Sequence, residues 1–217
     1  MATCLGRMSG SSENTALVVV DVQNDFCPGG ALEVSEGDSV VAPINALAPR
    51  FAIRAFTQDW HPSDHTSFAE NHPGADPFST VEMSYGTQVL WPAHCVQGTD
   101  GAAFHADLIT DRADIVVRKG FRSPIDSYSA FFENDKTTAT GLAGYLRDRS
   151  AAHLYFVGLA TDFCVAWSAL DAVKLGFEVS VVTDLCRAID LNGSLDAAMT
   201  NLRAAGVHLV TSQDALM

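Results

Sequence analysis

Six β-rich runs alternate with segments of helical periodicity along the chain, and this alternation is the feature that most restricts the fold. The runs cover residues 16–20, 51–57, 115–117, 153–157, 177–182 and 207–211. Parallel strands need long crossover connections, and helices usually supply them. The sequence therefore predicts an α/β fold of one domain, with an open, mostly parallel six-stranded sheet and helices on both faces.

The predicted helices begin at residues whose side chains can cap a helix N-terminus. Asp38 precedes a short helix, and Pro43 near the first turn of that helix favours a late start or a bend. Three further helices are predicted to begin at Thr140, Thr161 and Ser194, the second of them extending to residue 175.

The length of 217 residues suits one domain with a single large core. Residues 1–14 lack the apolar stretch of a signal peptide, so we expect a loose tail ahead of one domain over residues 15–217. Residues 60–110 show little periodicity and are rich in Gly, Pro and His, which is typical of a long functional loop. A disordered insertion is the alternative for this segment.

Composition excludes several classes of function. The formal net charge of −13 opposes binding to phosphate backbones and anionic membranes. No run of about 18 apolar residues is present to cross a bilayer. The five cysteines form an odd set without a CxxC motif, which favours free thiols in a reducing compartment. The sequence therefore predicts a cytoplasmic protein that binds neither nucleic acid nor membrane.

Cys164 is the candidate nucleophile. It follows the fourth β-rich run in the segment GLATDFC, as the third residue of the helix that Thr161 is expected to cap. A helix N-terminus lowers the pKa of a thiol, and its free N–H groups can hold an oxyanion. A small buried core residue is the alternative, since free cysteine is commonly buried.

Two charged residues follow other predicted strands. Asp21 ends the first run and can act as a base for a thiol, with a turn or capping aspartate as the alternative. Lys119 follows the third run and can stabilise negative charge, with an exposed surface lysine as the alternative. Because sites in open parallel sheets collect at the carboxyl ends of strands, these residues and Cys164 together suggest a nucleophile, a base and a charge stabiliser.

A candidate metal site follows the second run. Asp59 and His61 are two residues apart on an extended segment, so their side chains point the same way, and His94 lies further along the same irregular loop. One carboxylate and two imidazoles suit zinc, iron or manganese with open positions for water or a ligand. His65 is left open as a fourth ligand, a supporting residue or a substrate contact. Histidines bonded only to the backbone are the alternative.

Five segments, in order, resemble the nicotinamidases, which belong to the isochorismatase-like cysteine hydrolases. They are VDVQNDF at 20–26, DWHP at 59–62, WPAHC at 91–95, RKG at 118–120 and GLATDFC at 158–164. The resemblance runs from about residue 16 to the C-terminus. It implies an amidohydrolase of NAD salvage that converts nicotinamide to nicotinate and ammonia through a thioester, with pyrazinamide as a further candidate substrate.

The resemblance also implies roles for individual residues. It implies a catalytic triad of Asp21, Lys119 and Cys164. It implies one divalent metal ion, zinc first with iron or manganese as alternatives, held by Asp59, His61 and His94. It further implies a cis Leu159–Ala160 peptide and an oxyanion hole formed by the N–H groups of Ala160 and Cys164. The substrate ring would lie between aromatic side chains, with Phe26 and Trp91 on its two faces and Tyr128 closing the pocket.

Two alternatives belong to other substrate or function classes. A cysteine amidohydrolase of the same superfamily that acts on another small amide or an N-carbamoyl compound typically lacks the metal set of Asp59, His61 and His94. A non-catalytic α/β binding module with a structural metal is disfavoured, because structural zinc sites usually have four protein ligands and prefer cysteine. The sequence is compatible with either a monomer or a homo-oligomer.

Overall fold

The computed structural model describes residues 14–216, so the tail expected at residues 1–14 lies outside the described residues except for Asn14. The main sheet has the strand order β5-β2-β1-β6-β7-β8, and every neighbouring pair is parallel. Its strands are β1 (Thr15–Val20), β2 (Ile53–Asp59), β5 (Ile115–Lys119), β6 (His153–Leu159), β7 (Glu178–Arg187) and β8 (His208–Val210). The predicted six-stranded parallel sheet is confirmed.

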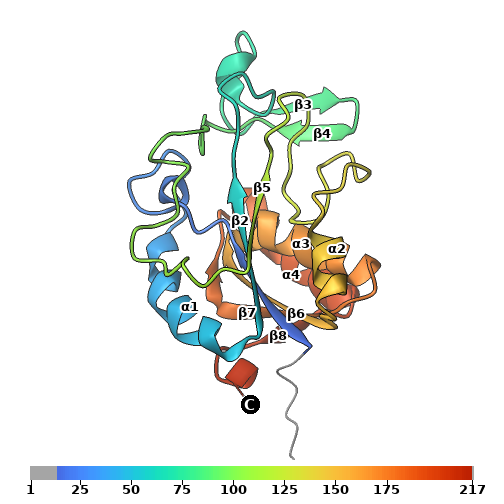
Figure 1. Ribbon diagram of the computed structural model, residues 1–217. Coiled ribbons are helices and arrows are strands. Elements are labelled where there is room, and N and C mark those ends of the chain that lie inside the picture. The colour runs from blue at the N-terminus through green and yellow to red at the C-terminus, as the bar shows by residue number, and fades with distance from the viewer. Residues whose placement is uncertain (1–13, 217) are drawn as a thin grey trace, which may run out of the picture.

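Helices cover both faces of the sheet (Figure 1). Helix α1 (Val41–Leu47) lies on one face, and on the other lie α2 (Leu142–Asp148), α3 (Ala166–Lys174) and α4 (Ser194–Ala204). The chain passes from β1 to β2 in one direction and from β6 to β7 and β8 in the other. Right-handed crossovers in opposite directions place their helices on opposite faces. No helix within residues 14–216 is long and apolar enough to span a bilayer.

Helix starts differ in detail from the predicted caps. A 3-10 turn over Gly37–Val40 precedes α1, so the helix expected from Asp38 starts late. A π-helical turn over Thr161–Val165 precedes α3, and its N-cap is Ala160 rather than Thr161. Ser194 is the first residue of α4 rather than its cap. The remaining 3-10 turns are Asn24–Phe26, Ala48–Arg50, Ala69–Asn71, Leu191–Gly193 and Asp214–Leu216.

The segment at 60–110 contains regular structure that the sequence did not predict. An antiparallel hairpin is formed by β3 (Thr80–Met83) and β4 (Gly86–Val89), beyond the carboxyl end of β2 (Figure 1). Each strand has only four residues, and most of them are at least partly exposed. Such short strands give too little alternation of apolar and polar residues to be recognised.

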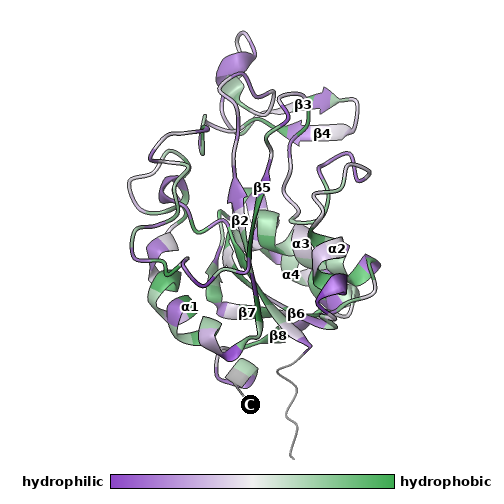
Figure 2. Ribbon diagram, viewed as in Figure 1, coloured by the Kyte–Doolittle hydropathy of each residue, from purple (hydrophilic) through white to green (hydrophobic). Residues whose placement is uncertain are grey.

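The core includes most of β1 and β6, the two central strands of the sheet, and hydrophobic residues gather on both sides of these strands (Figure 2). The run from residue 16 to 20 is completely buried, as expected of a central parallel strand covered on both faces. Gly158 on β6 has a φ of +111°, and a Cβ atom there would lie 2.1 Å from the carbonyl oxygen of Val20. A glycine is therefore required where the ends of β1 and β6 come together.

Candidate active site

The carboxyl ends of four neighbouring strands bring charged and nucleophilic side chains to one edge of the sheet. Asp21 follows β1, Asp59 ends β2, Lys119 ends β5 and Cys164 lies in the turn after β6. The chain direction across the sheet reverses between β1 and β6, and open α/β sheets bind ligands at such a point. The sequence placed Asp21, Lys119 and Cys164 at this edge, and the structure brings them into contact.

Lys119 is the centre of the group and is buried. Its Nζ donates hydrogen bonds to Asp59 Oδ1 at 2.5 Å and to the Ser127 carbonyl oxygen at 2.9 Å, and forms an ion pair with Asp21 Oδ2 at 2.8 Å. Cys164 Sγ lies 3.4 Å from the same Nζ. Burial disfavours the ammonium, but the two carboxylates outweigh it and raise the pKa of Lys119 well above its usual value. The alternative of an exposed surface lysine is therefore wrong.

Asp21 is oriented by Thr57 on β2. The Thr57 hydroxyl donates to Asp21 Oδ1 at 2.6 Å, and the Asp21 N–H donates to the same hydroxyl at 3.2 Å. Asp21 Oδ2 forms the ion pair with Lys119, but among residues 14–216 no donor has suitable geometry for a hydrogen bond to this oxygen. Burial raises the pKa of Asp21 to about 6, although the Lys119 charge lowers it. The carboxylate is thus ionised at neutral pH, with one oxygen available to accept a proton.

Cys164 is a buried thiol beside this carboxylate. Its Sγ and one oxygen each from Asp21 and Asp59 all lie within 4.8 Å of one another. Burial raises the pKa of the Cys164 thiol well above its usual value, and the Lys119 charge only partly opposes this. The prediction that the helix N-terminus lowers this pKa is therefore wrong, because removal from water outweighs the nearby N–H groups. The resting thiol is protonated and requires a base.

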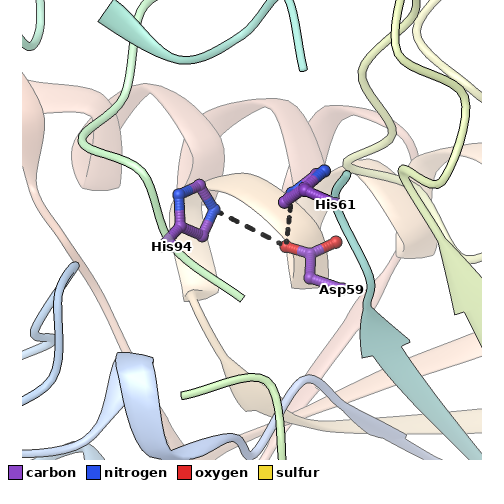
Figure 3. A group of neighbouring side chains, drawn as sticks. All are labelled: Asp59, His61 and His94. Atoms are coloured by element: carbon purple, nitrogen blue, oxygen red, sulfur yellow. Dashed lines mark ion pairs between the residues drawn. The ribbon is translucent and has the colours of Figure 1, made fainter. Parts of the chain in front are cut away.

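Figure 3 shows the side chains of Asp59, His61 and His94 pointing toward one another. An Asp59 oxygen also lies within 4.8 Å of the Cys164 sulfur. Asp59 Oδ2 lies 3.7 Å from His61 Nε2 and 4.0 Å from His94 Nε2. The other ring nitrogens donate to carbonyl oxygens: His61 Nδ1 to Gly120 and His94 Nδ1 to Pro92, both at 2.8 Å. These bonds turn both Nε2 atoms toward the carboxylate, as in metal sites whose ligands are held by backbone partners.

The electrostatics of the three side chains favour a cation between them. Burial and the neighbouring His61 lower the pKa of His94 to about 4, which keeps its imidazole neutral. Burial acts in the same direction on His61, but the Asp59 carboxylate outweighs it and raises the pKa of His61. A carboxylate and two imidazoles with donor atoms within 4.8 Å of one another fit a divalent transition metal in number and chemistry.

His65 lies beside this group but outside it. Its ring centroid is 4.5 Å from that of His61. The Ser67 side-chain oxygen lies 2.7 Å from His65 Nδ1, and the Ile125 carbonyl oxygen lies 3.3 Å from Nε2. His65 shares a possible ligand group with His61 and Asp126 rather than with Asp59. Both ring nitrogens therefore have protein partners, which fits a supporting residue better than a ligand.

A small cavity connects the thiol with the Asp59 group. Its walls include Phe26, Trp91 and Tyr128, the aromatic residues that the resemblance places around the substrate. Trp91 Nε1 donates to the Tyr128 hydroxyl at 3.1 Å. Phe163 was not predicted, yet it lines the same cavity and its ring centroid is 4.9 Å from that of Trp91. Its position directly before Cys164 was the signal that could have identified it.

A buried amide supports the wall of this cavity. Gln88 on β4 has its Nε2 atom 2.8 Å from Asp126 Oδ2 and 2.9 Å from the Tyr128 hydroxyl, while its Oε1 accepts a bond from Asn134 Nδ2 at 3.2 Å. Asp126 itself lines the cavity. Neither Gln88 nor Asp126 was predicted, because a single polar residue in an irregular segment carries no signal of burial.

The turn that carries the thiol begins at a cis peptide between Leu159 and Ala160, as the resemblance implies. Ala160 is the N-cap of the π-helical turn, and both Ala160 and Cys164 line the cavity. The two residues expected to form the oxyanion hole therefore lie within one short turn, which also carries the Cys164 thiol.

Comparison with known proteins agrees with this arrangement. The model of the isochorismatase domain matches residues 15–214. A nicotinamidase of Acinetobacter baylyi is 52% identical over 206 residues, which cover 95% of this chain and 96% of that protein.

Solved structures of the same class share the fold. The nicotinamidase/pyrazinamidase of Acinetobacter baumanii superposes with a TM-score of 0.93 at 56% identity, covering 94% of this chain and 99% of the other. A pyrazinamidase of Pyrococcus horikoshii, solved in complex with zinc, superposes with a TM-score of 0.74 at 35% identity, covering 91% and 99%.

Proposed function

The chain belongs to the isochorismatase family, and we propose that within it this protein is a metal-dependent cysteine amidohydrolase that converts nicotinamide to nicotinate and ammonia. This reaction returns the pyridine ring to NAD synthesis. Pyrazinamide, a close analogue of nicotinamide, is a second proposed substrate. The similarity to nicotinamidases over nearly the whole chain supports the proposal.

One observation carries the proposal: a thiol with a base beside it opens onto the same cavity as a group of side chains suited to bind a metal ion. The cavity is lined by Cys164, Asp59, His61 and His94, and an Asp21 oxygen lies within 4.8 Å of the Cys164 sulfur. A cysteine amidohydrolase needs a nucleophile and base in contact, with a group beside them that orients the substrate.

In the first half of the proposed reaction, Asp21 accepts the proton of Cys164 as Sγ attacks the amide carbon. The Ala160 and Cys164 N–H groups stabilise the oxyanion that forms. The C–N bond then breaks, Asp21 delivers the proton to the departing nitrogen, and ammonia leaves. The product of this half is a thioester between Cys164 and the nicotinoyl group.

In the second half, Asp21 accepts a proton from a water molecule that attacks the thioester carbon. The C–S bond breaks, the proton on Asp21 returns to Cys164, and the acid that forms loses the second proton of the water to solvent and leaves as nicotinate. Lys119 keeps its charge throughout and stabilises both the Asp21 carboxylate and the transient thiolate, which lie 2.8 and 3.4 Å from its Nζ. A fixed cation in a buried site stabilises neighbouring negative charge more strongly than a cation in water, since its surroundings screen it less.

Asp59, His61 and His94 are the residues proposed to hold the metal ion. When bound, a divalent ion would orient the pyridine ring and lower the pKa of water in the site. We propose zinc as the ion because two imidazoles and a carboxylate are typical zinc ligands and because the related Pyrococcus horikoshii pyrazinamidase was solved with zinc. Iron and manganese are the alternatives.

The aromatic walls are proposed to select a flat heterocycle. Phe26 and Trp91 would contact the two faces of the ring, and Tyr128, held by Trp91 and Gln88, would close the pocket. We place the reaction in the cytoplasm, since the four cysteines within residues 14–216 are free thiols, as in reducing compartments.

The direct test is ammonia release from a panel of amides, with and without a chelator. Nicotinamide and pyrazinamide should be hydrolysed, benzamide and N-carbamoyl compounds should not, and the chelator should remove the activity until zinc is restored. Benzamide is the informative control because it keeps the flat ring and the amide but lacks the ring nitrogen. Hydrolysis of N-carbamoyl compounds in preference to nicotinamide would contradict the proposal.

A further inference from the structure

A second group of two imidazoles and one carboxylate lies at the opposite end of the sheet from the candidate active site. His153, Glu178 and His208 are the first residues of the neighbouring strands β6, β7 and β8. In the strand register His153 pairs with Glu178, and His208 pairs with Ser180, two residues further along β7. Residues two apart on a strand point to the same face, so the three side chains share one face of the sheet.

The Glu178 carboxylate lies between the two rings. Its Oε1 atom is 3.6 Å from His153 Nδ1 and 3.7 Å from His208 Nε2. Donors of a tetrahedral zinc ion, each about 2.0–2.1 Å from the metal, lie about 3.4 Å from one another. In the Asp59 group the same carboxylate–imidazole distances are 3.7 and 4.0 Å. The carboxylate–imidazole distances are thus similar in the two groups, whereas in the first group, unlike the second, all three donor atoms lie within 4.8 Å of one another.

One side chain of the group is held by its neighbours, and the other two are exposed to solvent. His153 Nε2 lies 2.8 Å from the hydroxyl of buried Ser180, and its ring stacks on Tyr155 at 4.2 Å, so Nδ1 is held toward Glu178. The side chains of Glu178 and His208 are 59% and 58% exposed. The two histidine rings are 6.3 Å apart, against 5.0 Å for His61 and His94, so the exposed His208 side chain must turn inward for its Nε2 atom to share one ion with His153 Nδ1.

We propose that His153, Glu178 and His208 form a second site for a transition-metal ion of the zinc, nickel or copper class, with water completing the coordination. Two imidazoles and a carboxylate prefer these ions over magnesium or calcium, which favour sites made of oxygen atoms alone. The seven residues of β6 separate this site from the candidate active site by about 20 Å. A bound ion therefore links the amino ends of three strands and has no part in the amide chemistry.

The test counts zinc bound to the full-length protein after equilibrium dialysis. His208→Ala and Glu178→Gln should each bind one zinc fewer per chain than the wild type, or bind that zinc at least tenfold more weakly. The matched control is His105→Ala, since His105 is also partly exposed and its Nδ1 accepts a bond from the Asp107 N–H, outside both groups. The control should bind as much zinc as the wild type.

A His94→Ala background separates the two sites. In that background, zinc should still raise the melting temperature, and adding His208→Ala should abolish the rise, because only an ion bound to the folded state stabilises it. Equal zinc binding by the wild type and His208→Ala would overturn the proposal. An equal loss in His105→Ala would also overturn it, since it would show that surface histidines bind zinc without a defined site.

Discussion

The Asp59 carboxylate accepts a hydrogen bond from Lys119 with one oxygen and faces the two histidines of the metal group with the other. Oδ1 lies 2.5 Å from Lys119 Nζ, and Oδ2 lies 3.7 and 4.0 Å from the histidine Nε2 atoms. The same ammonium pairs with Asp21 at 2.8 Å. One buried lysine thus connects the proposed base with the proposed metal group, and the two halves of the site respond together to its loss.

Replacing Lys119 with methionine should destabilise the protein as well as inactivate it. The substitution keeps the volume but leaves two buried carboxylates without their cation, which costs about 3–5 kcal/mol. Urea unfolding should show this loss, and kcat for nicotinamide should fall at least about a hundredfold, as expected when a charge that stabilises the reacting groups is removed.

The matched control for this substitution is Lys174→Met. Lys174 also pairs with an aspartate, Asp171, but its side chain is mostly exposed, so the change should cost about 1 kcal/mol or less. Similar unfolding free energies for the two variants would contradict the central place given to Lys119.

The rate should fall on the acid side of about pH 6. Burial raises the pKa of Asp21 to about 6, with Lys119 opposing, and below that pH the carboxyl is protonated and cannot accept the thiol proton. The value of kcat/KM for nicotinamide should then decrease about tenfold per pH unit. Bound metal should be measured over the same range, because a decrease that only follows loss of metal would contradict the assignment to Asp21.

Iodoacetamide should modify Cys164 ahead of the other described cysteines. Burial raises the pKa of Cys27 to about 11, that of Cys186 to about 12 and that of Cys95 well above its usual value, whereas Cys164 has the proposed base Asp21 beside it. Peptide mapping by mass spectrometry should show labelling that nicotinamide blocks and that Asp21→Asn slows. Labelling of Cys27 at the rate of Cys164 would show that the neighbouring base has no influence.

Gln88→Ala should weaken substrate binding more than it slows turnover. The buried amide donates to Asp126 and Tyr128 in the cavity wall, and its loss removes one hydrogen bond from each at a cost of about 1–3 kcal/mol. KM for nicotinamide should rise about tenfold with kcat within a factor of about three, since the thiol and its base are untouched. Thr87→Ala, an exposed residue on the same strand, should leave both constants unchanged.

Much of the fold could be predicted because its signals are local. A continuous apolar run such as residues 16–20 identifies a central strand by itself, and the alternation of runs and helices implies a parallel sheet. The hairpin of β3 and β4 could not be predicted, because its four-residue strands are stabilised by contacts distant in sequence, such as that of Gln88 with Asp126. Strand order likewise depends on contacts that no single segment encodes.

The site shows the same division between local and long-range information. Asp21, Lys119 and Cys164 could be placed at one edge because each follows a recognisable strand. The pKa of Cys164 could not be predicted correctly, since the effect of a helix N-terminus is visible in sequence whereas burial is a property of the whole fold. The support of Asp21 by Thr57 depends on the pairing of β1 with β2 and was missed for the same reason.

The measurement that tests the account most directly is ammonia release by Cys164→Ala. The substitution removes only the thiol, so metal content and melting temperature should stay close to those of the wild type. With the nucleophile gone, kcat for nicotinamide should fall by about four orders of magnitude or more. A folded, metal-loaded Cys164→Ala protein that released ammonia at near wild-type rates would contradict covalent catalysis by this residue.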